Sequence, residues 1–377
     1  MENLKLKIIK KKDVLNFLDS LKEEYNILVP KEKDGDIRFS EFSSGEDIPW
    51  DYRNTKISPK EIFLPRTETL FSFKEGTLTP SDSGGVFAPA NEPKGSAQKT
   101  DSNKRTANYL IFGIRPCDAQ AFSLLDKLFG GDDFQDPYYL KRKEQAVIIS
   151  LACNKPQITC FCTSLKGKPD NEEGSDIILF DLGENILTKP ITKKGEEFIE
   201  NLNSWFKEAK EADIEKKNKL MDLSLKKICS GVDLHNIKEK LDEAFDISLW
   251  NEIHQKCLGC GICTYLCPTC YCFNIIDEMD HETGGLAPSR GKRIRCWDSC
   301  MFSLFTLHAS GHNPRPTFKE RMRQRIMHKF NYCPENFKEI FCVGCGRCIR
   351  NCPVNLDLRE TLASLMSFGS MSKDKKV

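Results

Sequence analysis

The chain has 377 residues, which is more than the usual length of one domain, so two domains are the natural expectation. Its formal net charge is +1, and this balance argues against a protein that attracts nucleic acid through a basic surface. The longest apolar runs, residues 109–114 and 146–153, are far too short to cross a bilayer. We therefore predict a protein that has no membrane span and binds no nucleic acid.

The 18 cysteines are unevenly distributed, since 13 of them lie between Cys257 and Cys352. Such density in a secreted chain would suggest disulfides, but the lysine-rich N-terminus has no apolar segment typical of a secretory signal. Reduced thiols that bind metal are the better interpretation. The sequence thus predicts a cytoplasmic, oxygen-sensitive protein.

In the first part of the chain we expect one short helix and two short strands, followed by a loop. Residues 13–25 place apolar side chains at helical spacing, and short strands are expected around 26–30 and 36–42. Residues 79–106 are rich in Ser, Gly, Pro, Ala and Lys, which indicates a mobile loop or insertion rather than a domain boundary.

Two buried strands follow, and each delivers a cysteine at its carboxyl end. Residues 109–114 lead through Cys117 into a predicted helix that Asp118 is placed to cap, and residues 146–153 end at Cys153. Because ligands in open α/β sheets gather beyond the carboxyl ends of strands, these two cysteines are expected to meet.

Cys160 and Cys162 lie on the loop after the second of these strands. Together with Cys117 and Cys153 they form a candidate third [4Fe–4S] site, since four thiolates suffice for a cubane. The alternative is that two of the four are small buried core residues, as free cysteine often is.

The middle of the chain predicts a hairpin over 177–191 and charged helical sequence over 193–227, with a further helix over 232–255. We place the domain boundary near Ser230. The expected fold is α+β: an α/β domain over 1–230 carrying the candidate third site, then a mainly helical two-cluster, ferredoxin-like domain over 231–370 with a long insertion between its cluster motifs.

Two copies of the pattern C-x2-C-x2-C-x3-C-P carry the most specific signal, starting at Cys257 and at Cys342. Two-cluster ferredoxins use this spacing for [4Fe–4S] clusters, and the fourth cysteine of each copy ligates the other cluster. A zinc site would leave the x3-C-P ending unexplained. The expected ligands are Cys257, Cys260, Cys263 and Cys352 for the first cluster, and Cys342, Cys345, Cys348 and Cys267 for the second.

The 74 residues between Cys267 and Cys342 are a long insertion in which no β-hairpin is evident. A helix is expected over 317–330, within a basic run that is either a solvated face, a partner-docking face or a source of positive charge for reduced clusters. His308 and His312 are expected to hydrogen-bond within the fold rather than to bind metal, because Gly311 and Pro314 break a helix there.

The insertion also contains a rival set for the third site. Its members are Cys270, Cys272, Cys296 and Cys300, of which the first two could instead pack against the second cluster. The two remaining cysteines, Cys229 and Cys333, are interpreted as structural.

Several motifs outside the ferredoxin signature resemble the 4Fe–4S dicluster family that contains the beta subunit of sulfhydrogenase and the corresponding iron–sulfur subunit of anaerobic sulfite reductase. They are Cys267-Pro-Thr-Cys270-Tyr-Cys272, Trp297-Asp-Ser-Cys300, Gly311-His-Asn-Pro-Arg315-Pro, Cys342-Val-Gly-Cys345-Gly-Arg-Cys348, Phe112-Gly-Ile-Arg-Pro-Cys117-Asp, Asp136-Pro-Tyr-Tyr139 and Cys160-Phe-Cys162. The resemblance covers most of residues 109–360. It implies a subunit that passes single electrons between a flavin subunit handling NAD(P)H and a catalytic or second iron–sulfur subunit, within a hetero-oligomer.

Neither a dinucleotide fingerprint nor a Walker loop is visible, and no acid–base constellation suggests a catalytic residue. The sequence therefore favours an electron-transfer subunit of a sulfhydrogenase, anaerobic sulfite reductase or heterodisulfide reductase-associated type, with two [4Fe–4S] clusters and a third expected. The alternative is a catalytic subunit that reduces a small sulfur compound or a disulfide at an exposed cluster.

Overall fold

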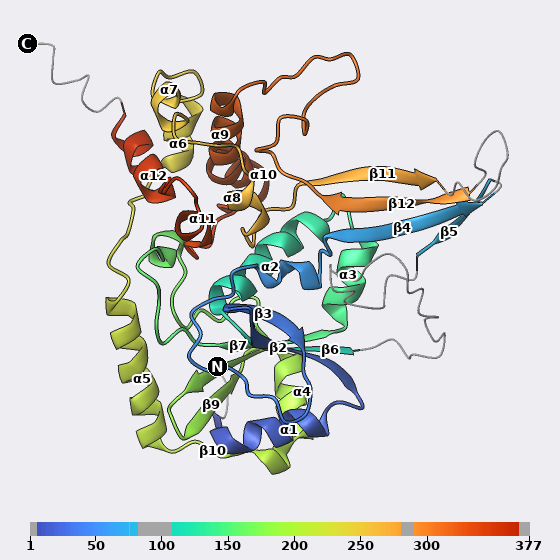
Figure 1. Ribbon diagram of the computed structural model, residues 1–377. Helices are drawn as coiled ribbons and strands as arrows, with labels where there is room; N and C mark the ends of the chain where they lie inside the picture. Colours follow the sequence, from blue (N-terminus) through green and yellow to red (C-terminus); the bar gives the residue numbers. More distant parts are fainter. Residues whose placement is uncertain (1–5, 75, 82–107, 280–289, 369–377) are drawn as a thin grey trace, which may run out of the picture.

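The computed structural model describes residues 6–74, 76–81, 108–279 and 290–368, and it is a mixed α/β structure (Figure 1). Its larger sheet has eight strands in the order β10-β1-β9-β8-β7-β6-β2-β3. Their bounds are Lys7–Lys10 (β1), Tyr25–Lys33 (β2), Asp36–Glu41 (β3), Asn108–Ile114 (β6), Ala146–Leu151 (β7), Ile177–Asp181 (β8), Asn185–Pro190 (β9) and Lys207–Glu208 (β10). Most of the loop expected at 79–106 lies outside the described residues.

The centre of this sheet, β2-β6-β7-β8, is parallel, and β8 and β9 form the predicted antiparallel hairpin. Both faces are covered, which is why β6 and β7 read as continuous apolar runs. On one face Leu110 and Phe112 pack against α1 (Val14–Ser20) and α4 (Lys193–Asn201). On the other face Ile111 packs against α2 (Pro116–Phe129) and α3 (Pro137–Glu144).

A second, antiparallel sheet forms a projecting arm (Figure 1), in the order β11-β12-β4-β5. Its strands are Thr67–Lys74 (β4), Thr77–Pro80 (β5), Phe273–Met279 (β11) and Arg290–Trp297 (β12). The expectation that the insertion holds no hairpin is therefore wrong. Every residue of β11 is exposed, so the strand lacks the alternation by which a half-buried strand is recognised.

A buried ion-pair network holds the base of this arm against the larger sheet's helices. Glu68 of β4 lies between Arg142 of α3 and Arg295 of β12, and the Nε of Arg295 donates to Glu68 at 3.0 Å. Arg295 also pairs with Asp136, the N-cap of α3. The network joins residues more than 200 positions apart, and it orients the insertion relative to the N-terminal part.

Short helices form the C-terminal part of the chain. They are α6 (Ile237–Asp242), α7 (Trp250–Ile253), α8 (Ile262–Tyr265), α9 (Phe318–Met327), α10 (Cys333–Phe337), α11 (Arg347–Arg350) and α12 (Leu358–Ser367). Their core includes the fully buried Trp250, Leu241, Ile326, Phe330 and Leu362.

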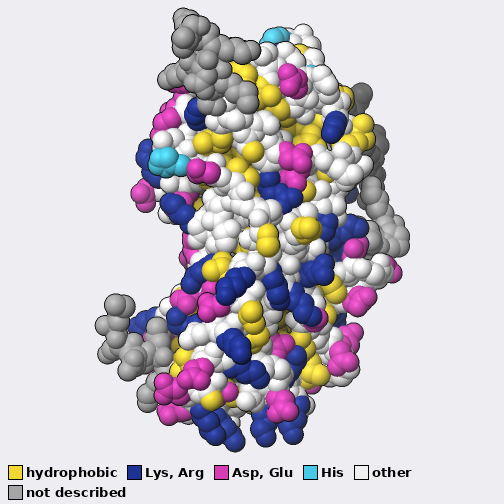
Figure 2. Space-filling model, turned by 90° about the vertical axis from the view of Figure 1, so that its left-hand side faces the viewer, with side chains coloured by type: hydrophobic (Ala, Val, Ile, Leu, Met, Phe, Trp, Pro, Cys, Tyr) yellow, Lys and Arg dark blue, Asp and Glu magenta, His cyan; other side chains and the backbone are white. Residues whose placement is uncertain are grey.

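Two predicted helices are interrupted. The helix expected over 232–255 breaks between α6 and α7, where the indole of Trp250 donates to the carbonyl of Ala244 at 2.7 Å. The charged segment 193–227 breaks after α4 so that β10 can pair with β1 before α5 (Glu211–Lys226) begins. On the face that Figure 2 shows, Lys and Arg side chains are frequent over the lower half of the molecule, and apolar side chains are more frequent over the upper half.

Candidate metal centres

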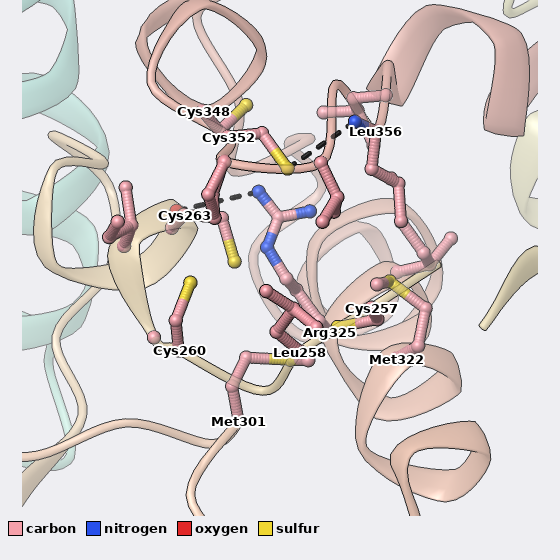
Figure 3. Close-up of a pocket in the computed structure, with 16 residues that line it drawn as sticks. Cys257, Leu258, Cys260, Cys263, Met301, Met322, Arg325, Cys348, Cys352 and Leu356 are labelled. Carbon is pink, nitrogen blue, oxygen red and sulfur yellow. Dashed lines mark hydrogen bonds between the residues drawn. The ribbon is translucent and has the colours of Figure 1, made fainter. Parts of the chain in front are cut away.

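The thiols of Cys257, Cys260, Cys263 and Cys352 line one pocket (Figure 3), together with Cys348 and Arg325. Cys257 and Cys260 come from the loop that enters α8, Cys263 lies within α8, and Cys352 comes from the turn after α11. The remaining walls are mostly apolar, among them Met301, Met322 and Leu356. This arrangement matches the first predicted ligand set, including the cysteine that crosses over from the second motif.

Backbone amides point at two of these sulfurs. The amide of Gly259 donates to Cys257 Sγ at 3.4 Å, and that of Leu356 donates to Cys352 Sγ at 3.3 Å. Hydrogen bonds of this kind stabilise negative charge on a ligating sulfur and thereby raise the reduction potential of a cluster. Cys260 is exposed, so this set lies at the molecular surface.

The second predicted set, Cys267, Cys342, Cys345 and Cys348, is also brought together. Burial raises the pKa of Cys342 to about 11, and the nearby Cys267 and Cys345 raise it as well. Cys267 and Cys345 are buried, and the other two are half-buried. A cluster held here would be more shielded from solvent than one in the first set.

The third predicted set also converges. Cys117 lies in the first turn of α2, Cys153 follows β7, and Cys160 and Cys162 lie on the next loop; all four line one pocket with Cys345. Burial raises the pKa of Cys160 to about 11. The Gln157 amide, which donates to the Cys160 sulfur at 3.3 Å, opposes this shift by lowering the pKa. The structure therefore brings together the four cysteines proposed from the strand-end argument.

Asp118 does not cap α2, contrary to the sequence-based expectation. The helix begins at Pro116 with Arg115 as its N-cap, so Asp118 falls inside the first turn. Its carboxylate instead binds Arg347, a residue of the second cysteine motif. Arg115 reaches the end of β7, where its guanidinium donates to the carbonyls of Leu151 and Ala152 at 3.1 and 2.8 Å.

Glycines of the second motif allow the third set to approach the second one closely. The amide of Phe161 donates to the carbonyl of Gly344 at 2.9 Å, and the thiol of Cys160 lies 3.8 Å from the carbonyl of Cys345. A Cβ at Gly344, which has φ +62°, would lie 2.5 Å from the backbone nitrogen of Cys162. Glycine is required there both by the backbone conformation and by the contact.

The corresponding glycines of the first motif have a different neighbour. A Cβ at Gly259 would lie 2.5 Å from the ring of Phe318, and a Cβ at Gly261 would lie 2.6 Å from the ring of Phe302. The two motifs share a sequence pattern, but one is covered by aromatic side chains and the other by a cysteine-bearing loop.

Buried cations lie between the sets, and they belong to the basic run for which the sequence left a cluster-facing role open. Arg325 lies between the first two: burial opposes its charge, but Cys263 and Cys348 raise its pKa well above the ordinary value. Lys329 donates to Thr269 Oγ1 and to the Phe341 carbonyl, both at 2.9 Å. Burial opposes its charge too, and Cys267 and Cys270 raise its pKa.

These cations come from the basic run at 315–329, which the sequence left open between solvated and cluster-facing roles. Arg321, Arg325 and Lys329 are all buried, four residues apart, so they share one face of α9 and its continuation. The continuation is a π-helical turn over His328–Tyr332, a feature that is frequent at functional sites. The four-residue spacing of Arg and Lys was the available sequence signal.

Three members of the rival set in the insertion are also neighbours, so both candidate sets persist in the structure. Cys272 and Cys300 lie close enough to shift each other's pKa, and Cys270 acts on both Cys300 and Cys267. Cys229 is exposed, and Cys333 is buried in a core cluster that also contains Cys345 and Cys117. His308 and His312 contact each other, with ring centroids 5.4 Å apart, and their backbones are hydrogen-bonded.

The donor chemistry fits iron–sulfur clusters. Within the described part of the chain, no three His, Cys, Asp or Glu side chains come close enough together to hold a single metal ion. The four thiolates of a cubane bind four different irons, so they lie farther apart than the ligands of one ion. Sets of four thiols around a shared pocket, with amide donors to sulfur, have the composition that a [4Fe–4S] cluster requires.

The fold and these thiol sets define an iron–sulfur protein of the 4Fe–4S, electron-transport class. In agreement, the family model described as "4Fe-4S dicluster domain" matches residues 256–356. Sulfhydrogenase 2 subunit beta from Pyrococcus furiosus is 30% identical over 341 residues, which cover 90% of this chain and 92% of that protein. The chain belongs to the family of this sulfhydrogenase beta subunit, as the sequence motifs predicted.

In the part of the chain that the structure describes, no helix has the length and apolar character needed to traverse a bilayer.

Proposed function

We propose that this chain is the electron-transfer subunit of a cytoplasmic multisubunit oxidoreductase and carries two [4Fe–4S] clusters in its ferredoxin-type motifs and a third at Cys117, Cys153, Cys160 and Cys162. The clusters would supply one-electron redox chemistry. The protein would hold them in fixed order, shield them from water and set their potentials through buried charge and amide hydrogen bonds.

The observation that carries the proposal is that the three thiol sets form one series. Cys345 of the second set also lines the pocket of the third set, and Cys348 lines the pocket of the first. The second set is therefore the middle member. A continuous series of this kind suits conduction between two partners better than it suits chemistry at one isolated site.

The two ends of the series differ in their surroundings. At the first set Cys260 is exposed beside Leu258, whose side chain is 61% exposed. The pocket of the third set is lined by the cations Arg53, Lys155 and Lys168. Lys155 and Lys168 pair with Asp51 and Asp170, so one end offers an apolar surface and the other a charged one, which supports two different partner subunits.

By analogy with the family, the partners would be a flavin subunit that handles NAD(P)H and a catalytic or second iron–sulfur subunit, in a hetero-oligomer. The relative is named as one subunit of a sulfhydrogenase, which supports a multisubunit assembly here.

The alternative is a catalytic subunit that reduces a sulfur compound at an exposed cluster, and the exposed Cys260 is the observation that favours it. The isolated, cluster-loaded chain should show no turnover of sulfite, polysulfide or disulfides with reduced viologen. Robust turnover by that chain would refute the electron-transfer proposal.

The third site is tested by anaerobic iron quantification and EPR on the wild type and on Cys160→Ser/Cys162→Ser. We expect the variant to lose about four irons per chain. A variant that folds and keeps all of its iron would show that these thiols hold no cluster. Cys229→Ser is the control, because Cys229 is exposed and lies outside every set.

A further inference from the structure

We propose a fourth iron–sulfur site in the insertion, in which Cys270, Cys272, Cys296 and Cys300 hold a [4Fe–4S] cluster with Lys60 as its buried counter-ion. The site is additional to the three of the proposed function, and it does not depend on whether the chain conducts electrons to a partner.

The sheet register places Cys272 and Cys296 on one face of the arm. Cys296 of β12 pairs with Asn274 of β11, two residues after Cys272. The Asp298 amide donates to the carbonyl of Cys272 at 2.9 Å, which extends the ladder by one residue. Side chains that are diagonal neighbours on one face of a sheet lie about 7–8 Å apart. That separation lets the two thiolates bind different irons of one cubane.

The turn after β12 brings Cys300 to the same place. The thiols of Cys272 and Cys300 lie close enough that each shifts the pKa of the other, and Cys270 also acts on Cys300. The turn is fixed by Ser299, whose hydroxyl is bonded to Thr264 at 2.7 Å and to the amide of Met301 at 3.1 Å. The thiols of Cys270, Cys272 and Cys300 are therefore neighbours, and the sheet register adds Cys296 on the face that carries Cys272.

An unpaired buried cation beside these thiols is the second, independent observation. Lys60 is 3% exposed, and its Nζ donates to the Cys270 carbonyl at 2.7 Å and to the Thr264 carbonyl at 3.4 Å. Its ammonium also lies 4.2 Å from the ring centroid of Trp297. Among the described residues, no carboxylate lies within ion-pair distance of it.

Burying an ammonium without a partner charge is costly. Burial lowers the pKa of Lys60, and the groups that oppose this effect most strongly are the thiolates of Cys270 and Cys267. Lys329 faces Cys270 and Cys272 as well, and Arg325 faces Cys300, so Lys60 is a further cation at these thiols, contributed by the N-terminal part of the chain. A negatively charged cluster at the insertion thiols would offset the charge of Lys60 where no acidic residue does.

The competing interpretation is that Cys272 and Cys300 form a disulfide, since the two thiols are neighbours. It predicts no iron at this position and two fewer free thiols. The two interpretations therefore differ in the iron content and in the number of free thiols, and both are measured on the same sample.

The test is anaerobic iron and sulfide quantification on the full chain, comparing the wild type with Cys272→Ser/Cys300→Ser, with Cys160→Ser/Cys162→Ser and with the four-fold combination. We expect each pair to remove about four irons per chain and the combination to remove about eight. The control is Cys229→Ser/Cys333→Ser, which should keep all iron. Unchanged iron in folded Cys272→Ser/Cys300→Ser would overturn the site, as would a wild-type thiol titration showing a disulfide.

The third and fourth sites are tested independently, because Cys160→Ser/Cys162→Ser should remove iron only from the third site. If Cys272→Ser/Cys300→Ser does not fold, Cys296→Ala on β12 replaces it, and the readout is the loss of one EPR signal in the reduced protein. Lys60→Met, with Lys60→Arg as the charge-conserving control, should lower the reduction potential of that signal more than that of the second cluster, whose ligand Cys267 also faces Lys60. An unshifted potential together with a full set of signals in Cys296→Ala would also refute the site.

Discussion

Arg347 and Asp118 form a two-pronged ion pair in which both nitrogen–oxygen distances are 2.7 Å and neither side chain reaches solvent. Asp118 follows Cys117 of the third set, and Arg347 lies between Cys345 and Cys348 of the second. The guanidinium also donates to the backbone carbonyl and the hydroxyl of Thr55, at 2.7 and 3.0 Å. One side chain thus ties three distant segments together at the boundary between two cysteine sets.

Removing one partner of this pair should destabilise the protein strongly. Arg347→Met leaves the Asp118 carboxylate buried without its counter-ion, for which we expect a loss of about 3–5 kcal/mol in the free energy of unfolding. The measurement is anaerobic denaturant unfolding. Asp118→Asn/Arg347→Met should recover part of the loss, because no lone charge remains.

The control for that experiment is Lys155→Met, which removes an ion pair with Asp51 in which both side chains are largely exposed. It should unfold within error of the wild type. Equal effects of Lys155→Met and Arg347→Met would mean that burial of the Arg347 pair has no energetic consequence.

Gly344→Ala should separate the third set from the second. Its new Cβ would meet the backbone of Cys162 at 2.5–2.6 Å, which forces the cysteine-bearing loop away. We expect the variant to lose about four irons per chain while the two ferredoxin-type signals persist in EPR.

Gly45→Ala is the matched control, because Gly45 also has positive φ, +78°, but nothing lies within 4 Å of its added Cβ. Both variants carry the backbone cost of about 1–2 kcal/mol for a left-handed residue with a side chain. Iron loss in Gly45→Ala as well would attribute the effect to the backbone rather than to the loop contact.

Crossed ligation predicts that Cys352→Ser changes the cluster of the other motif. Cys352 lines the pocket of Cys257, Cys260 and Cys263, so its replacement should alter the EPR signal and potential of that cluster and leave the second unaltered. Cys267→Ser should do the reverse. Cys333→Ser, a buried cysteine outside the sets, should change neither signal, and a Cys352→Ser effect on the second cluster would refute the crossing.

Exposure predicts the order in which oxygen damages the clusters. The first set has the exposed Cys260, whereas the second contains the buried Cys267 and Cys345. On controlled exposure to air, the EPR signal that Cys352→Ser alters should decay first, with about four irons released before the rest. Earlier decay of the signal altered by Cys267→Ser would contradict this order.

The sequence was most informative where chemistry is local. The spacing from Cys257 to Cys267 and from Cys342 to Cys352 predicts cluster loops without any tertiary information, because the loop itself supplies three thiolates. The meeting of Cys117 with Cys153 was also predictable, since parallel strands end at the same edge of a sheet.

Other features depend on contacts that no local pattern encodes. β12 forms its ladder with β4, and Arg295 finds Glu68 more than 200 residues away, so the arm was missed. Lys60 lies in a 3-10 turn over Pro59–Ile62 with no sequence feature that distinguishes it from a surface lysine. Its burial becomes visible only when the insertion folds over it.

The contact between Gly344 and the loop of Cys162 has a consequence for maturation of the protein in the cell. The pocket of the third set is closed by Gly344 and Cys345, so its walls are incomplete until the C-terminal part has folded against the N-terminal part. A scaffold that delivers iron and sulfide during synthesis would meet the N-terminal cysteines first but could not complete that centre until the last segment of the chain had emerged. Loading should therefore proceed against the direction of synthesis, with the C-terminal motifs filled before the N-terminal site.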